Sequence, residues 1–414
     1  MMSTIIKNIK YLYQTEEGPA FKTKVSGADL AQIPFIEHAW LLIENGLIKA
    51  YGKMSELTDF KCDVSYDASN SLVLPAWCDS HTHLVFAAAR EQEFVDRIKG
   101  KTYEEIARNG GGILNSAAKL RAMDESELYD QSYARLQQVI AQGTGAIEIK
   151  SGYGLSVEAE LKMLRVIRKL KENSDVSIKA TFLAAHAYPI EYKEDKESYI
   201  KLIIDTMLPK VAAEGLADYM DVFCEQGFFS VADTDRLLEA AWKFGLKPKI
   251  HANQLHYSGG VQIGVQHRAV SVDHLECVGE AEIEALKKGS TMPTLLPAAA
   301  FFLGIPYQPA RQIIDAGLPV ALASDYNPGS CPSGNMNLLA TIACTQLKMT
   351  PIEAINAITI NGSAAMELDQ ELGSIAVGKK ANLIITQPMN SLDNIPYDFG
   401  NNPVKKMMIQ GKFV

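Results

Sequence analysis

The chain has 414 residues, of which 47% are hydrophobic and 21% are charged, the balance of a globular protein with a large core. Its 49 acidic and 40 basic residues give a net charge of −9, which argues against a surface that binds nucleic acid or an anionic membrane. The six cysteines form no Cys-x-x-Cys pair, no apolar run approaches ~20 residues, and the N-terminus lacks the layout of a signal peptide. We therefore expect a cytoplasmic protein with reduced thiols.

Both ends of the chain are predicted to be rich in β-structure. Near the N-terminus, two apolar runs at 39–43 and 47–51 flank the dipeptide Asn45-Gly46, which is a strong β-hairpin signal. The segment from residue 378 onward has similar short apolar runs. Neither end has enough strands for a well-covered sheet. We therefore predict that residues 1–71 and 378–414 together form one small β-sandwich domain.

The segment between these ends, residues 72–377, alternates strand and helix patterns. A helix is predicted over 156–171, where Ser156 can cap an apolar stripe at helical spacing. An open doubly wound sheet would normally show a glycine-rich phosphate turn after its first strand, and none is present. The pattern therefore favours an α/β fold, a (β/α)8 barrel. The eight candidate strands are 72–78, 146–150, 177–185, 219–224, 248–250, 269–273, 291–296 and 319–323.

The first candidate strand ends in Asp79-Ser80-His81-Thr82-His83. Residues i and i+2 of a strand point to the same side, so His81 and His83 would present two imidazoles next to each other. Neutral imidazole is the commonest protein ligand for zinc and iron. A single His-x-His is a weak signal, and its weight depends on whether other strands supply further ligands.

Polar residues follow most of the other candidate strands, at the end where barrel enzymes carry their sites. Five of the eight histidines are at such positions, where random placement would scatter them. Taken singly, His186 and His251 could be core histidines and Asp325 a turn-forming residue. The joint pattern favours a site. Its members are His81, His83, Lys150, Ser151, Tyr153, His186, Glu225, His251, His274, Ser324, Asp325 and Asn327.

Four of these residues, His81, His83, His251 and Asp325, give three nitrogen ligands and one oxygen ligand. This set suits one divalent ion per subunit, Zn²⁺ or iron as Fe²⁺ or Fe³⁺, with an open position for water. Such an ion lowers the pKa of bound water to about 7, and the resulting hydroxide can attack a carbonyl or amidine carbon. Asp325 could accept the water proton, and His274 could stabilise the oxyanion or pass a proton to the leaving nitrogen.

The positions of these histidines and of Asp325 on the first, fifth, sixth and eighth strands resemble the amidohydrolase superfamily. Finer motifs, which span most of the chain, resemble the imidazolonepropionase family within it. These motifs are residues 79–86 followed by 90–94, then 100–106, 110–113, 148–155 and 324–330. The resemblance implies hydrolysis of the cyclic amide of 4-imidazolone-5-propanoate to N-formimino-L-glutamate in histidine degradation, by a homodimer.

This small-molecule substrate carries a carboxylate tail, which Arg90 could bind in a bidentate fork while Tyr153 adds a hydroxyl contact. The resemblance implies catalytic roles for His274, Asp325 and Gln254. It also implies substrate contacts at Arg90, Tyr153, His186, Gln254, Asn327, Gly329 and Ser330.

The chain departs from the family pattern after the fifth strand. Many members carry Asp-Glu where this chain has Asn253-Gln254. Gln254 can hydrogen-bond but cannot act as a base, so acid–base chemistry shifts to Asp325 and His274. No lysine ends the fourth candidate strand, which favours a single ion over a pair bridged by a modified lysine.

Two alternatives stay open from the sequence. Another amidohydrolase, such as a heterocycle deaminase or a cyclic amidase, would share the metal ligands without needing Arg90. A non-catalytic scaffold with the same fold would have no need of the complete set of four ligands.

Overall fold

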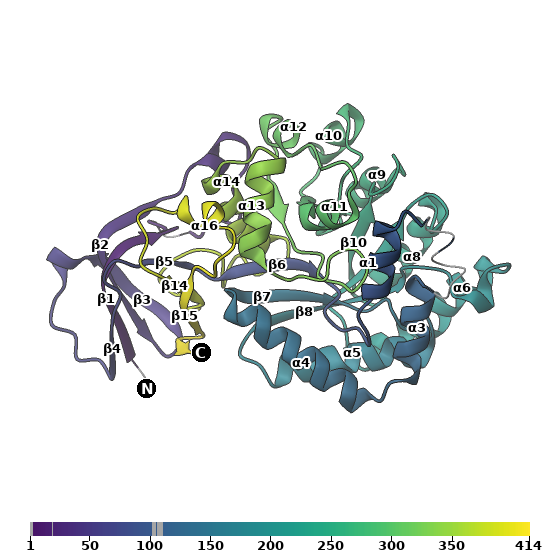
Figure 1. Ribbon diagram of the computed structural model, residues 1–414, viewed down its shortest axis with the longest axis horizontal. Coiled ribbons are helices and arrows are strands. Elements are labelled where there is room, and N and C mark those ends of the chain that lie inside the picture. Colours follow the sequence, from purple (N-terminus) through teal and green to yellow (C-terminus); the bar gives the residue numbers. More distant parts are fainter. Residues whose placement is uncertain (1–2, 19, 102–104, 106–110) are drawn as a thin grey trace.

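The computed structural model describes residues 3–18, 20–101, 105 and 111–414. Parts of the motifs at 100–106 and 110–113 therefore lie outside the described residues. Two eight-stranded sheets organise the described chain, one built from its two ends and one from its middle. Figure 1 shows them side by side, with the terminal sheet on the left and both termini in it.

The terminal sheet joins the two ends of the chain as predicted. Its centre is β5, which pairs with β1 on one side and with β14 on the other. Asn45 and Gly46 have φ angles of 53° and 82° and form the predicted hairpin turn. The strands are β1 (Ser3–Tyr13), β2 (Phe35–Glu44), β3 (Leu47–Lys53), β4 (Val64–Asp67), β5 (Leu72–Pro75), β14 (Leu383–Thr386), β15 (Val404–Ile409) and β16 (Lys412–Phe413).

The second sheet is parallel and follows chain order, as a (β/α)8 barrel requires. Its first and last strands meet through two backbone hydrogen bonds: Asp325 N donates to His81 O at 3.0 Å, and His83 N donates to Tyr326 O at 2.9 Å. The predicted fold class is confirmed. The strands are β6 (Trp77–Thr82), β7 (Thr144–Lys150), β8 (Ser177–Ala185), β9 (Tyr219–Cys224), β10 (Lys247–Ala252), β11 (Ser271–His274), β12 (Met292–Leu295) and β13 (Ala321–Leu322).

The predicted first strand, 72–78, was wrong in one respect. Its first part is β5 of the terminal sheet, and the chain passes at Ala76 into β6 of the barrel. Ala76 N donates to Asn382 O and Trp77 N donates to Gly143 O, each at 2.9 Å, so adjacent residues bond to different sheets. Both strands are fully buried, and hydrophobicity alone therefore gives no sign of the change.

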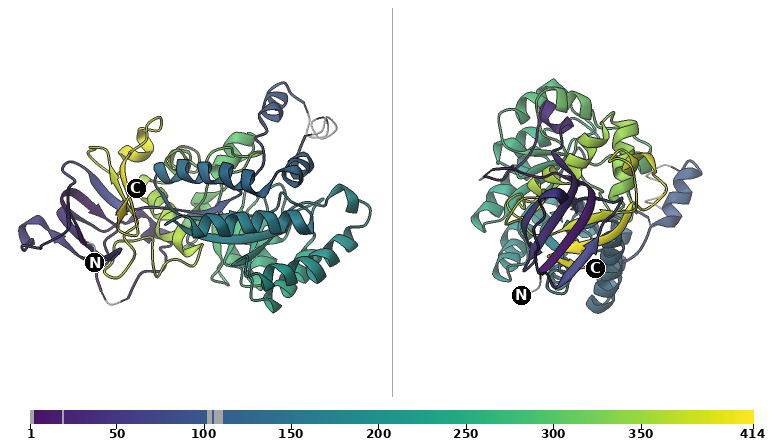
Figure 2. Two further views of the ribbon diagram at one scale, coloured as in Figure 1. Left: turned by 90° about the horizontal axis from the view of Figure 1, so that it is seen from below. Right: turned by 90° about the vertical axis from the view of Figure 1, so that its left-hand side faces the viewer.

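Helices cover the outside of the barrel, and the segment that carries α1 rises from its body (Figure 2). The predicted helix at 156–171 is α5 (Val157–Glu172), and its apolar stripe is buried. No helix among the described residues is long and apolar enough to cross a membrane. The other helices are α1 (Glu91–Ile98), α3 (Ile113–Ala122), α4 (Glu125–Ala141), α6 (Lys196–Leu202), α7 (Leu208–Ala213), α8 (Val231–Lys243), α9 (Gly260–Gln266), α10 (Glu280–Leu286), α11 (Pro297–Leu303), α12 (Ala310–Asp315), α13 (Met336–Gln346), α14 (Pro351–Ile358), α15 (Ile360–Ala364) and α16 (Asn394–Tyr397). Short helical turns occupy Gly27–Ala31, Met54–Glu56, Ile190–Tyr192 and Ile203–Met207.

Candidate active site

His81 and His83 lie buried at the end of β6, as the sequence predicts. Burial lowers the pKa of both imidazoles well below the usual range, with smaller contributions from Lys150 and the neighbouring histidines. Both rings are therefore neutral at pH 7, the form that binds a metal. His81 Nδ1 lies 2.7 Å from Asp273 Oδ2, and its Nε2 has no hydrogen-bond partner among the described residues. This arrangement leaves Nε2 available as a ligand.

His251, from β10, and Asp325, after β13, lie beside these two histidines. His251 Nε2 lies 3.4 Å from His83 Nε2. Asp325 Oδ1 lies 3.6 Å from the Nε2 atoms of both His81 and His83. Ligand atoms bound about 2.1 Å from one tetrahedral ion lie about 3.4 Å apart. The spacing and the chemistry of these donors therefore fit a single zinc or iron ion.

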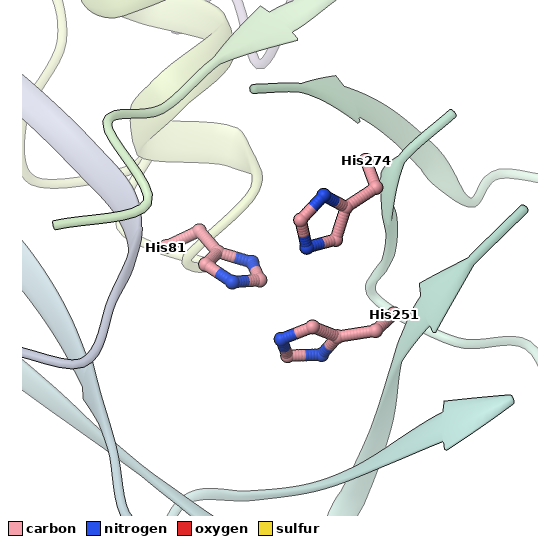
Figure 3. A group of neighbouring side chains, drawn as sticks. All are labelled: His81, His251 and His274. Atoms are coloured by element: carbon pink, nitrogen blue, oxygen red, sulfur yellow. The ribbon is translucent and has the colours of Figure 1, made fainter. Parts of the chain in front are cut away.

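His274 approaches the same cluster from β11. Figure 3 shows the rings of His81, His251 and His274 converging, and ligand atoms of the three lie within 4.8 Å of one another. His274 Nδ1 lies 3.7 Å from the buried Glu276 carboxylate. Burial disfavours the charged imidazole, but the carboxylates of Glu276 and Asp325 outweigh it and raise the pKa of His274. His274 is thus able to hold a proton beside the cluster.

A cavity of about 370 Å³ opens onto this cluster and brings the predicted substrate contacts together. Its wall includes apolar side chains such as Phe223 and Ile305, which suit a flat ring. Every predicted substrate-contact residue lines it: Arg90, Tyr153, His186, Gln254, Asn327, Gly329 and Ser330.

Arg90 caps the N-terminus of α1 and extends into the cavity. Its Nη2 donates to Glu93 Oε2 at 2.5 Å. A Cβ at Gly329 would lie 2.4 Å from Arg90 Nη1, so the guanidinium packs directly on the glycine backbone. Arg97, two turns along α1, also lines the cavity and donates to Gly329 O at 3.0 Å. The sequence analysis missed Arg97, although its spacing from Arg90 places both on one helix face.

The loop after β13 is shaped by Asn327 and Ser330. Asn327 Oδ1 accepts hydrogen bonds from Gly329 N and Ser330 N, both at 2.8 Å. Ser330 Oγ donates to Asp325 Oδ2 at 3.0 Å. These bonds hold Asp325 with Oδ1 toward the histidines. The side chain that forms the turn is therefore Asn327 and not Asp325, and the loop also lines the cavity.

Tyr153 and His186 form the wall beside His83. The His186 ring stacks on that of His83 at a centroid distance of 5.2 Å. Burial lowers the pKa of His186 to about 3. Its Nδ1 lies 3.1 Å from Gly152 O, which can only accept, so Nδ1 carries the proton and Nε2 is an acceptor. Burial also raises the pKa of Tyr153, which remains a neutral hydroxyl.

Gln254 lines the cavity at the position where the family pattern has a glutamate. Asn253 is buried beneath it and donates to Cys277 O at 2.9 Å. Glu225 accepts hydrogen bonds from Leu255 N at 2.9 Å and His256 N at 3.3 Å, so it holds this loop. Gln254 therefore offers the cavity an amide and no acid.

The sequence analysis missed the carboxylates behind the histidines. Asp221 Oδ2 lies 3.0 Å from His251 Nδ1. In the same way, Asp273 Oδ2 lies 2.7 Å from His81 Nδ1. A carboxylate in this position fixes the tautomer and orientation of a ligand histidine. A signal was available, because acidic residues inside otherwise apolar strands must find partners when buried.

The chain is similar to known proteins in both sequence and fold. The model of the amidohydrolase family matches residues 72–414. Two relatives named imidazolonepropionase, from Flavobacterium johnsoniae and Christiangramia forsetii, are 58% and 55% identical over 413 residues, covering 100% of both chains in each case. E. coli guanine deaminase superposes with a TM-score of 0.73 at 14% identity, covering 100% of this chain and 99% of its own. An adenosine deaminase from Xanthomonas campestris with bound zinc gives 0.70 at 15% identity, covering 100% and 92%.

The barrel, its histidine cluster and the family match together define the class: the chain belongs to the amidohydrolase family. The deaminases share the fold at low identity, and their likeness shows the fold alone. The full-length relatives are more specific. Within the amidohydrolases, the chain belongs to the imidazolonepropionase family.

Proposed function

We propose that this chain hydrolyses 4-imidazolone-5-propanoate to N-formimino-L-glutamate in histidine degradation, with one zinc or iron ion per subunit. One observation carries the proposal. A single cavity joins a cluster of three histidines and a carboxylate to the guanidinium of Arg90. The substrate has the matching two parts, a cyclic amide and a carboxylate tail. A neutral heterocycle would bring no carboxylate for Arg90 to bind.

The residues that would hold the ion are His81, His83, His251 and Asp325. An ion bound there would supply a Lewis acid and lower the pKa of water to about 7. The neutral state of the histidines and their ligand-atom spacing support this assignment. Zinc and iron both accept this set of donors, and the metal content of the purified protein decides between them.

Asp325 and His274 carry the proton movements. The water oxygen adds to the ring carbonyl carbon while Asp325 accepts the water proton. His274 donates a hydrogen bond to the oxygen on which negative charge develops. The carbon–nitrogen bond then breaks and Asp325 returns the proton to the leaving nitrogen, so the ring opens to a carboxylic acid. This acid releases its remaining proton to solvent and becomes a carboxylate.

Arg90 positions the substrate by its tail. A guanidinium binds a carboxylate through two parallel hydrogen bonds, which fix direction as well as distance. Tyr153, His186 and Gln254 supply neutral hydroxyl, imidazole and amide groups for the ring. Because none of them is charged, the one charge contact orients the substrate with its ring toward the ligand cluster.

Compartment and assembly also remain proposals. Six cysteines without a disulfide support a reducing compartment, the cytoplasm. The family resemblance supports a homodimer. Light scattering on the purified protein tests the assembly directly, with twice the chain mass of 45.4 kDa as the expected result.

The activity test follows the loss of substrate absorbance with purified protein and identifies the product. We expect one N-formimino-L-glutamate for each substrate consumed. Release of ammonia with the ring still closed would instead indicate a deaminase.

A further inference from the structure

Behind the histidines, five charged side chains with relative exposures of 0% pair with one another. We propose that one of them, Lys150, is a positioning residue that holds the metal ligands through two aspartates and so sets how tightly the ion is retained. The proposal rests on the metal site of the proposed function. The five residues are Glu148, Lys150, Asp221, Lys249 and Asp273.

Lys150 contacts the same oxygen atoms that face the histidines. Its Nζ lies 2.8 Å from Asp221 Oδ2 and 3.6 Å from Asp273 Oδ2. Those two oxygens lie 3.0 Å from His251 Nδ1 and 2.7 Å from His81 Nδ1. One ammonium therefore bridges the carboxylates behind two of the four ligands.

In this geometry Lys150 not only neutralises the two aspartates but also fixes the position of their oxygens. Each carboxylate has a further bond from its other oxygen: Asp221 Oδ1 accepts from His251 N at 3.1 Å, and Asp273 Oδ1 accepts from Ser271 Oγ at 2.5 Å. Lys150 donates a hydrogen bond to the Asp221 oxygen nearest His251, and it lies within ion-pair distance of the Asp273 oxygen nearest His81. Without the ammonium, each oxygen loses the contact that fixes its position, and the imidazole orientation loosens with it.

A second lysine of the cluster, Lys249, provides a control for Lys150. Lys249 is equally buried and pairs with Glu148. Its ammonium otherwise donates to the backbone oxygens Ser80 O at 3.1 Å and Ala365 O at 3.2 Å. Removing Lys249 takes one positive charge out of the cluster, as removing Lys150 does. The aspartate oxygens behind the histidines, however, keep their contact with Lys150.

The test compares two double variants of equal net charge, Glu148→Gln/Lys150→Gln and Glu148→Gln/Lys249→Gln. Each loses one acid and one lysine. The zinc-loaded proteins are mixed with a chromogenic chelator, and the rate of zinc transfer is followed while circular dichroism reports folding. We expect the double variant that lacks Lys150 to lose zinc about 10- to 100-fold faster than wild type, the range found for outer-shell partners.

We expect the double variant that lacks Lys249 to lose zinc at a rate within about threefold of wild type, because the carboxylates behind the histidines keep their contact with Lys150.

Equal rates in the two double variants would overturn the proposal. If the double variant that lacks Lys150 does not fold, Lys150→Arg replaces it: the charge stays, but a planar guanidinium cannot occupy the same point between the two oxygens. A zinc-transfer rate equal to wild type in Lys150→Arg would then contradict the positioning role. Zinc transfer is measured without substrate, so it separates this proposal from the activity. A wild type that holds zinc but leaves the substrate intact overturns the proposed function alone, whereas a wild type that holds no zinc overturns both.

Discussion

Arg90 and the histidine cluster share one cavity but have different parts in the proposed reaction. Replacing Arg90 by alanine removes the charge contact to the substrate tail and leaves the ligand cluster intact. We expect Arg90→Ala to raise KM about 10- to 100-fold, the effect of losing a charged hydrogen bond. Metal content should stay at the wild-type value. An unchanged KM would contradict the carboxylate clamp, and parallel loss of metal would show that Arg90 supports the cluster instead.

A substitution at Gly329 tests the contact between Arg90 and the substrate carboxylate by displacing the guanidinium. A Cβ there would lie 2.4 Å from Arg90 Nη1, so Gly329→Ala must displace the guanidinium. We expect KM to rise about tenfold, equivalent to ~1.4 kcal/mol, with metal content unchanged. Gly400→Ala is the matched control, because a Cβ at Gly400 would meet no atom within 4 Å. If both variants behave alike, the close packing of Arg90 on Gly329 has no part in binding.

Gln254 separates hydrogen bonding from proton transfer. An amide does not titrate in the working range, so removing it cannot change which groups ionise. We expect Gln254→Ala to lower kcat/KM about tenfold while the pH profile of kcat/KM keeps its shape. Loss of one limb of that profile would show that Gln254 takes part in the proton movements after all.

At this scale the proposed ligands could be predicted from the sequence, whereas the pairing of each with its supporting carboxylate could not. His81, His83, His251 and Asp325 follow apolar strands, so each is visible as a polar residue at a strand end. Asp221 lies inside a strand, where alternation alone does not tell a barrel-facing charge from a helix-facing one. Pairing Asp221 with His251 also requires the register between β9 and β10, which becomes visible only in the folded barrel.

Among the elements, α14 offers a test of electrostatics away from the site. Thr350 caps this helix, and the buried Glu353 accepts from Thr350 N at 2.7 Å and pairs with Arg311 at 3.0 Å. Burial acts to raise the pKa of Glu353, but these partners outweigh it and lower the pKa below its usual 4.5.

The sign of the pH dependence follows from that lowered pKa. The stability from Glu353 is fully present above its unfolded value of 4.5 and is lost as pH falls through the lower folded value. We expect Glu353→Gln to destabilise the protein by about 1 kcal/mol at pH 7. Urea denaturation at a series of pH values measures the difference between wild type and variant, which should narrow below pH 4.5. A difference that stays constant down to pH 4 would contradict the linkage.

The elements also show where sequence patterns stop being informative. Seven of the eight barrel strands were predictable because each is a short apolar run between helices. The change from β5 to β6 was not, since Leu72–Pro75 and Trp77–Thr82 are one continuous buried run. Only the hydrogen-bond partners of Ala76 and Trp77 reveal that two sheets share it.

In the whole molecule, the proposed metal ligands come from the first and last strands of the barrel as well as from its middle. His81 and His83 end its first strand and Asp325 follows its last, and backbone bonds join the two segments. An ion held there stabilises the closed barrel by mass action. We expect a chelator to lower the thermal unfolding midpoint, with about 4 kcal/mol lost relative to metal at a thousandfold excess over Kd. Adding zinc back should restore the midpoint. A midpoint that changes with neither chelator nor zinc would contradict an ion bound at this position.

The two-domain plan was also predictable, because neither end alone has enough strands to cover a core. The hydrogen-bonding order β14–β5–β1 was not, because pairing partners more than 300 residues apart leave no local signal.

The most direct test of the proposed reaction measures turnover of 4-imidazolone-5-propanoate against metal occupancy. Metal-free protein is titrated with zinc or with iron, and substrate loss and N-formimino-L-glutamate formation are recorded at each step. The proposed site predicts a rate that rises in proportion to bound metal and reaches its limit at one ion per chain. Turnover that does not depend on metal, or a chain with one bound ion that leaves the substrate intact, would contradict it.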